Sequence, residues 1–345
     1  GYLSTMKEIQ EKLLVFLDNN DNSEDSLQQF INFLTNKQIL NEILEDFLNL
    51  ISSISMNHKR TTYFIEKIES ILTCLKDEIM HKFTNSNLFN IFKENKRILL
   101  FLFKNNYIKI DEYVSNCLTS NDDFSYYFTP ELILYLTKEE ANNSSFEENR
   151  EKGENENHLC QLIRNDSIKE FTDYINQNNL PINKTKIELS SYETNPFLMR
   201  SVKISLIEYA AFYGSIELVK YLHQNKVDMN PSIWLCAVHS NNLELINFLE
   251  DNKVIPKDNN YISSYLEAIK CYHNNIAHYI QDKYMKKLEF NDSDLAKLIE
   301  CYNFEFVSQN LVNEKFFNCF CRKDYISLVN ILIKDVDVNK TNKDI

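Results

Sequence analysis

Apolar residues recur at three- and four-residue spacing along most of this chain, which is the spacing of one helical face. In residues 1–137 the pattern predicts amphipathic helices over 3–18, from Ser26 onward, through Ile39–Ile51 and over 61–83. Helix-capping residues follow at regular intervals: Asn85 or Ser86, Asn95, Asp111, and Pro130 at the start of a last helix. This half of the chain is therefore expected to be a helical bundle or a run of helical hairpins.

Residues 139–157 interrupt the pattern, because Ala141 and Phe146 are the only apolar residues among many glutamates and asparagines. Such a stretch has little to bury, so the entropy cost of ordering it is not offset. We expect a flexible acidic linker at 139–157 between an N-terminal domain (1–138) and a C-terminal domain (158–345).

A helix–joint–helix pattern begins after the linker and is clearest over 205–222. Apolar positions mark two short helices, and Gly214 falls between them, where a left-handed residue ends a helix without a Cβ penalty. Similar second helices are predicted at six apolar anchors: Ile168, Ile216, Leu243, Ile276, Phe304 and Ile326. Residues 182–204 would be an insertion between two of these pairs.

The segment 205–230 resembles an ankyrin repeat. Leu206–Ala211 stands where that family has Thr-Pro-Leu-His-x-Ala-Ala, Gly214–Leu222 matches Gly-His-x-Glu-Ile-Val-x-x-Leu, and 225–230 matches Gly-Ala-Asp-Val-Asn. The whole chain resembles the divergent ankyrin-repeat proteins that form large families in some protozoan parasites, in which an N-terminal helical region precedes the repeats. It departs from the family because Thr-Pro-Leu-His is nowhere intact and Asn or Asp replaces Gly at most helix joints.

The resemblance implies an all-α protein, in which helical hairpins or a bundle precede an ankyrin-repeat solenoid of about six units. It also implies a non-catalytic adaptor or scaffold that binds a protein through the concave face of the repeats. The positions just before each helix joint would contact the partner: Phe212, Tyr213, His239, Ser240, Tyr272 and His273. The alternative for these residues is packing between adjacent repeats, and Trp234 is expected in the core.

Charge and composition disfavour some classes of binding partner. The net charge of −13 disfavours binding to nucleic acid or anionic membranes. No apolar run approaches the ~18 residues that a membrane span needs. Most of the eight cysteines lie inside apolar helical patterns, which is typical of reduced core cysteines in a cytoplasmic protein. The chain begins at Gly1 rather than Met, which is compatible with a processed start.

Candidate chemistry is sparse. The spacing of Cys271, His273 and His278 is the most similar to that of metal ligands, and Cys319-Phe-Cys321 is the second most similar. Neither group forms the two close ligand pairs of a structural zinc site. His158 and Cys160 lie close in sequence, yet Cys160 falls on the apolar side of its helix. We therefore expect no metal, no cofactor and no enzymatic activity. A structural subunit of a large assembly and a secreted effector that binds host proteins remain alternatives to the adaptor.

Overall fold

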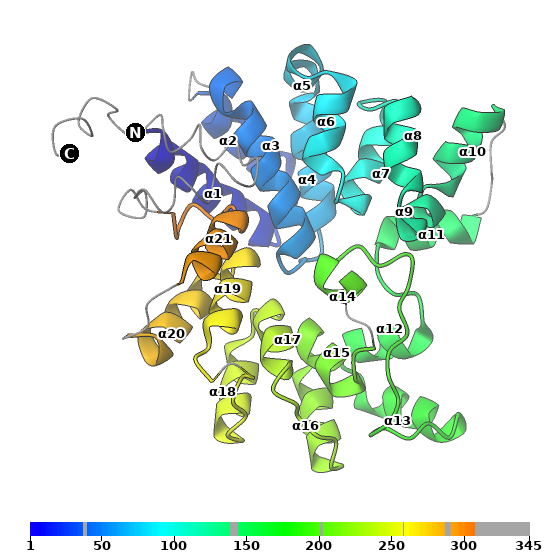
Figure 1. Ribbon diagram of the computed structural model, residues 1–345, viewed down its shortest axis with the longest axis vertical. Helices are drawn as coiled ribbons and strands as arrows, with labels where there is room; N and C mark the ends of the chain where they lie inside the picture. Colours follow the sequence, from blue (N-terminus) through cyan, green and yellow to red (C-terminus); the bar gives the residue numbers. More distant parts are fainter. Residues whose placement is uncertain (37–39, 139–143, 201–202, 258, 287–290, 308–345) are drawn as a thin grey trace. The chain divides into compact units, whose positions relative to one another are not determined.

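The computed structural model describes residues 1–36, 40–138, 144–200, 203–257, 259–286 and 291–307 (Figure 1). These residues form helices and one isolated antiparallel bridge, between Lys186 and Ser205, with no strand among them. The all-α expectation is thus confirmed for the described chain. Two compact units share the chain, and each is considered separately.

Unit 1 comprises Gly1–Ser55, Arg60–Phe92 and the described part of Lys287–Ile345. Its helices are α1 (Tyr2–Asp18), α2 (Glu24–Thr35), α3 (Leu40–Asn57, with its last two residues in unit 2), α4 (Phe64–Cys74), α5 (Lys76–Lys82), α6 (Asn85–Phe92) and α21 (Asp292–Glu300). The segment predicted as one helix over 61–83 is two, because the chain leaves helical geometry at Leu75 (φ −99°, ψ 13°). In the core, the rings of Phe16 and Phe30 stack at 5.3 Å between centroids.

Residues 301–307, the described part of the chain after α21, belong to unit 1. They are not helical, so the second repeat helix expected at Phe304 is not formed, and the one expected at Ile326 lies outside the described residues. Buried Gln10 on α1 donates to Asn303 Oδ1 (2.7 Å) and accepts from the backbone N–H of Phe304 (2.8 Å). Tyr302 donates to Asp46 on α3 (3.0 Å). Because buried polar groups require hydrogen-bond partners, these contacts fix the segment against α1 and α3.

Unit 2 comprises Met56–Lys59 and Lys93–Lys286. Its first helices are α7 (Lys96–Lys104), α8 (Glu112–Thr119), α9 (Asp122–Tyr127), α10 (Thr129–Thr137) and α11 (Ser144–Lys152). Two expected N-caps are confirmed, since Asn95 accepts from the N–H of Ile98 and Asp111 from that of Val114. The cap expected at Asn85 or Ser86 is wrong, because α6 begins at Asn85 and Thr84 accepts from the N–H of Asn87. Short side chains of this kind satisfy N–H groups that a helix leaves unpaired at its start.

The acidic stretch expected to be a flexible linker contains α11. Its Arg150 is 1% exposed and forms ion pairs with Glu131 (2.7 Å) and Glu147 (2.5 Å). The same guanidinium donates to the backbone carbonyl of Tyr127 (2.9 Å). A buried Arg in such a bidentate arrangement orders a segment that has almost no apolar surface to bury.

Four helix pairs make up the rest of unit 2. They are α12 (His158–Arg164) with α13 (Ile168–Gln177), α15 (Leu206–Tyr213) with α16 (Ile216–Gln224), α17 (Ile233–His239) with α18 (Leu243–Asp251), and α19 (Ile262–Lys270) with α20 (Asn274–Tyr284). The first helices α12, α15, α17 and α19 pack side by side in chain order (Figure 1). The insertion between α13 and α15 carries the short helix α14 (Pro196–Arg200).

The same backbone device joins the two helices of every pair. Two residues before each second helix, the chain takes a positive φ, at Asp166 (52°), Gly214 (74°), Asn241 (51°) and Tyr272 (58°). The ends of three second helices also match one another. Asn178, Asn225 and Asn252 each donate from the side chain to the carbonyl four residues earlier, and Asn179, Lys226 and Lys253 follow with positive φ. The pairs are therefore structural repeats in the described chain.

The Gly214 joint leaves little room for a side chain. A Cβ at this position would lie 3.1 Å from Ser240 Cβ, on a backbone that L-residues adopt at a cost. We expect Gly214→Ala to lower the free energy of unfolding by about 1–2 kcal/mol, measured by urea denaturation. The matched control is Asn241→Gly at the next joint, where a change within about 0.5 kcal/mol is expected. Equal effects of the two variants would contradict this account of the joint.

Candidate functional site

The six side chains expected to bind a partner lie at helix joints of unit 2, but Tyr272 and His273 are in a different register from the other four. Tyr272 is itself the left-handed residue of its joint, as Gly214 and Asn241 are of theirs. The positions that correspond to Phe212–Tyr213 and His239–Ser240 are therefore Lys270–Cys271. The sequence-based alignment of the fourth pair was two residues off, because α20 begins at Asn274 and not at Ile276.

Five of the six are buried. Phe212 is 8% exposed, His239 3%, Ser240 0%, Tyr272 3% and His273 1%, and only Tyr213 is partly exposed. The five buried side chains form part of the interior of unit 2, in agreement with the alternative that they pack between adjacent repeats. Trp234 is also buried, as expected, and its indole N–H donates to the carbonyl of Val254 (2.7 Å).

Aromatic stacking holds the joints of α15 and α17 together. The Phe212 ring stacks on the imidazole of His239 at 4.7 Å between centroids. Phe197, from α14 in the insertion, packs against both rings, at 5.7 Å from Phe212 and 4.5 Å from His239. The insertion thus contributes a side chain that covers the two joints. The sequence carried no signal for this contact, because it depends on where a non-repeating loop lies.

His239, Glu267 and Cys271 form a polar cluster beside this stack, which we call the joint triad. Glu267 lies on α19, Cys271 is the C-cap of that helix one turn later, and His239 is the last residue of α17. His239 Nε2 donates to Glu267 Oε1 (2.7 Å), while Cys271 Sγ lies 3.3 Å from His239 Nδ1. Burial raises the pKa of Glu267, but the hydrogen bond and charge of His239, together with Lys270, outweigh it and hold that pKa below its usual value.

Two further histidines lie next to the triad without joining it. His58 donates from Nδ1 to the carbonyl of Cys271 (2.8 Å). His273 donates from Nδ1 to the carbonyl of Val238 (2.6 Å), and its Nε2 accepts from the N–H of Lys59 (3.4 Å). Burial, and then the nearby His58, lower the pKa of His273 well below its usual value, so its ring is neutral. Its role is to satisfy backbone groups at the joint.

The structure gives Cys271 different neighbours from those the sequence suggested. His239 and Glu267 approach its thiol, whereas His273 is engaged with the backbone. The i, i+4 spacing of Glu267 and Cys271 placed them on one helical face, but only the correct repeat register would have added His239. Cys319 and Cys321 lie outside the described residues.

Cys160 and His158 show no sign of an activated thiol. Cys160 is 1% exposed, and burial raises its pKa to about 11 despite a hydrogen bond to Tyr209. A nucleophilic cysteine instead needs its pKa lowered toward neutrality. The His158 ring packs edge-on against Tyr174 at 5.3 Å.

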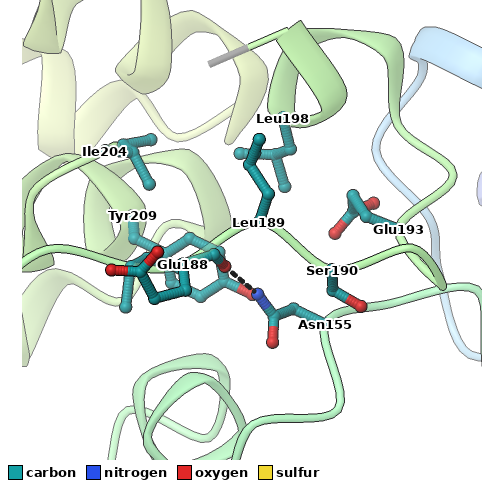
Figure 2. A pocket seen from close by; sticks show the side chains of 9 residues that line it. Asn155, Glu188, Leu189, Ser190, Glu193, Leu198, Ile204 and Tyr209 are labelled. Atoms are coloured by element: carbon teal, nitrogen blue, oxygen red, sulfur yellow. Dashed lines mark hydrogen bonds between the residues drawn. The ribbon is translucent and has the colours of Figure 1, made fainter. Parts of the chain in front are cut away.

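A small cavity opens near α15, between the insertion and the segment before α12 (Figure 2). Asn155 donates there to the carbonyl of Glu188 (2.9 Å), and the side chains of Glu193, Leu198 and Tyr209 also line it. Its volume of about 20 Å³ is room for roughly one water molecule. The cavity can hydrate buried polar groups, and it is too small for an organic substrate.

No helix among the described residues combines the length and apolar character that a membrane crossing requires. No family model, curated protein or solved structure matches this chain. Its joints must therefore be interpreted from their own geometry.

The aromatic stack makes Phe212 a test of burial at the joints. We expect Phe212→Ala to lower the free energy of unfolding by about 3–5 kcal/mol in urea denaturation, because the variant leaves a cavity between Phe197 and His239. Leu136→Ala is the control, since Leu136 is 71% exposed and its loss should cost no more than about 0.5 kcal/mol. If Phe212→Ala is as stable as the control variant, the Phe212 side chain is not buried and this account of the joint is wrong.

Proposed function

We propose that this chain is a non-catalytic protein-binding scaffold, whose repeats resemble ankyrin repeats in sequence. The observation that carries the proposal is the array of four helix pairs with recurring joints in unit 2. Arrays of this kind stack their repeats into one continuous core and present an extended surface made of equivalent positions. Such surfaces are suited to binding another macromolecule over a large area.

Polar and charged side chains connect the second helices of neighbouring pairs. Lys220 on α16 forms an ion pair with Glu244 on α18 (2.8 Å). Glu250 on α18 accepts from Tyr279 (2.9 Å) and pairs with Lys283 (2.7 Å) on α20. A mixed-charge surface of this type supports a protein partner better than a polyanion, in agreement with the negative net charge.

Partner contacts are assigned to the connections between helix pairs, because the joint residues are buried. The connection after α13 exposes Leu189 (59%), and the connection after α18 exposes Ile255 (52%). Loops carried on a rigid scaffold commonly supply binding residues. In the ankyrin family, which the sequence resembles, connections at this place also contribute contacts.

The test is affinity purification with the intact chain as bait, followed by quantitative mass spectrometry. We expect a stoichiometric protein partner, and a loss of at least about tenfold in its capture by a Leu189→Asp, Ile255→Asp double variant, the size of effect that loss of one interface hot spot produces. Leu136→Asp makes the same chemical change at an exposed site on α10 and should capture the partner normally.

All three proteins should have unchanged thermal unfolding midpoints. Absence of any enriched partner would contradict the scaffold function. Capture lost in the Leu136 variant but kept in the double variant would contradict the assignment of the contacts to these two connections.

A further inference from the structure

We propose that the joint triad, His239, Glu267 and Cys271, is a binding site for a divalent transition-metal ion, with Zn²⁺ the best chemical match. The potential ligand atoms of these three residues all lie within 4.8 Å of one another. This inference is independent of the scaffold function, because it rests only on side chains in the interior of unit 2.

The backbone brings the three donors together from two adjacent repeats. Glu267 and Cys271 project from the same face of α19, since residues four apart are neighbours on a helix. His239 enters from the end of α17, and the first helices of these repeats pack against each other. The Phe212 and Phe197 rings contact the imidazole, so its position is held by packing.

The distances suit a tetrahedral ion. Zinc bonds of about 2.3 Å to sulfur and 2.0–2.2 Å to nitrogen or oxygen place neighbouring ligand atoms roughly 3.4–3.6 Å apart. Cys271 Sγ lies 3.3 and 3.7 Å from the two imidazole nitrogens. The Nε2 to Oε1 distance of 2.7 Å is that of a hydrogen bond, and it needs to open by roughly 0.7 Å as the metal replaces the proton on Nε2. That proton is released to solvent, and the thiol proton of Cys271 passes to Nδ1, 3.3 Å away, which leaves a thiolate and a neutral imidazole as ligands.

Charge and donor chemistry select the ion. A thiolate, a carboxylate and a neutral imidazole carry two negative charges in total, which balance a divalent cation in a buried site. Sulfur and nitrogen donors favour zinc over Mg²⁺ or Ca²⁺, which take oxygen ligands. Lys270 Nζ lies 3.6 Å from Glu267 Oε1, but its side chain is 33% exposed and can turn toward solvent when a cation binds.

Metal binding would connect α17 to α19 and so fix one repeat against the next. Because an ion that binds only the folded chain stabilises it by mass action, zinc should raise the thermal unfolding midpoint. The protein would lose this stabilisation when a chelator removes the metal.

The experiment uses the full chain, stripped with EDTA and dialysed, then titrated with ZnCl₂ or CoCl₂. We expect about one zinc per chain by elemental analysis, a raised midpoint on zinc addition, and a thiolate-to-cobalt charge-transfer band with Co²⁺. Glu267→Gln and Cys271→Ser should each weaken zinc binding at least tenfold, and Cys271→Ser should abolish the cobalt band.

Two controls separate this site from other thiols. Cys236→Ala removes a buried cysteine of α17 that is not in the triad and should keep zinc binding unchanged. A Cys319→Ser, Cys321→Ser double variant should also bind normally. Circular dichroism checks that each variant is folded, and Glu267→Gln, which keeps the side-chain shape, decides the matter if Cys271→Ser unfolds. Less than about 0.1 zinc per wild-type chain, or a cobalt band that persists in folded Cys271→Ser, would overturn the proposal.

Discussion

The helix joints of unit 2 depend on one constraint, which is that polar groups taken out of water need partners within the protein. Each joint turns the chain through a left-handed residue, and the turn brings the end of one first helix against the next. At the fourth joint, around Tyr272, the constraint is met by imidazoles, because His273 donates to the carbonyl of Val238 and His58 to that of Cys271. The joint triad satisfies its own polar atoms in the same manner.

Buried polar side chains in unit 1 also have hydrogen-bond partners within the protein. Lys67 on α4 is 1% exposed and donates to the carbonyls of Phe16 and Asn19, near the end of α1. Gln10 and Asp46 provide the matching contacts to the segment after α21. Burial of a lysine or glutamine costs free energy unless such bonds are made, so these side chains specify which elements meet. The stacked rings of Phe16 and Phe30 lie in the same core.

Local signals in the sequence predicted most of the helices, and tertiary contacts explain the rest. The caps at Asn95 and Asp111 were predictable because a helix start is a local event. Helix α11 was not, since its order depends on the pairing of Arg150 with Glu131, nineteen residues away. The fourth joint was misaligned because Tyr272 takes a backbone conformation that glycine or asparagine usually adopts.

The candidate site shows the same division between local and tertiary information. The sequence located the first three joints, misplaced the fourth by two residues, and gave two interpretations of their aromatic and histidine residues, partner contact or packing. The choice depends on Phe197, which comes from a loop outside the repeats and covers Phe212 and His239. Neither the composition nor the periodicity of the sequence predicts that contact. The joint triad likewise requires the position of α19 beside α17.

The central claim of this account is that the joint residues lie inside unit 2. Thiol labelling of the native chain, mapped residue by residue with mass spectrometry in the presence of EDTA, tests it most directly. Cys74 is exposed and should be alkylated readily, whereas buried Cys271 and Cys236 should react only as the protein unfolds. A folded chain that alkylates Cys271 as fast as Cys74 would contradict the account and make the joints an accessible face.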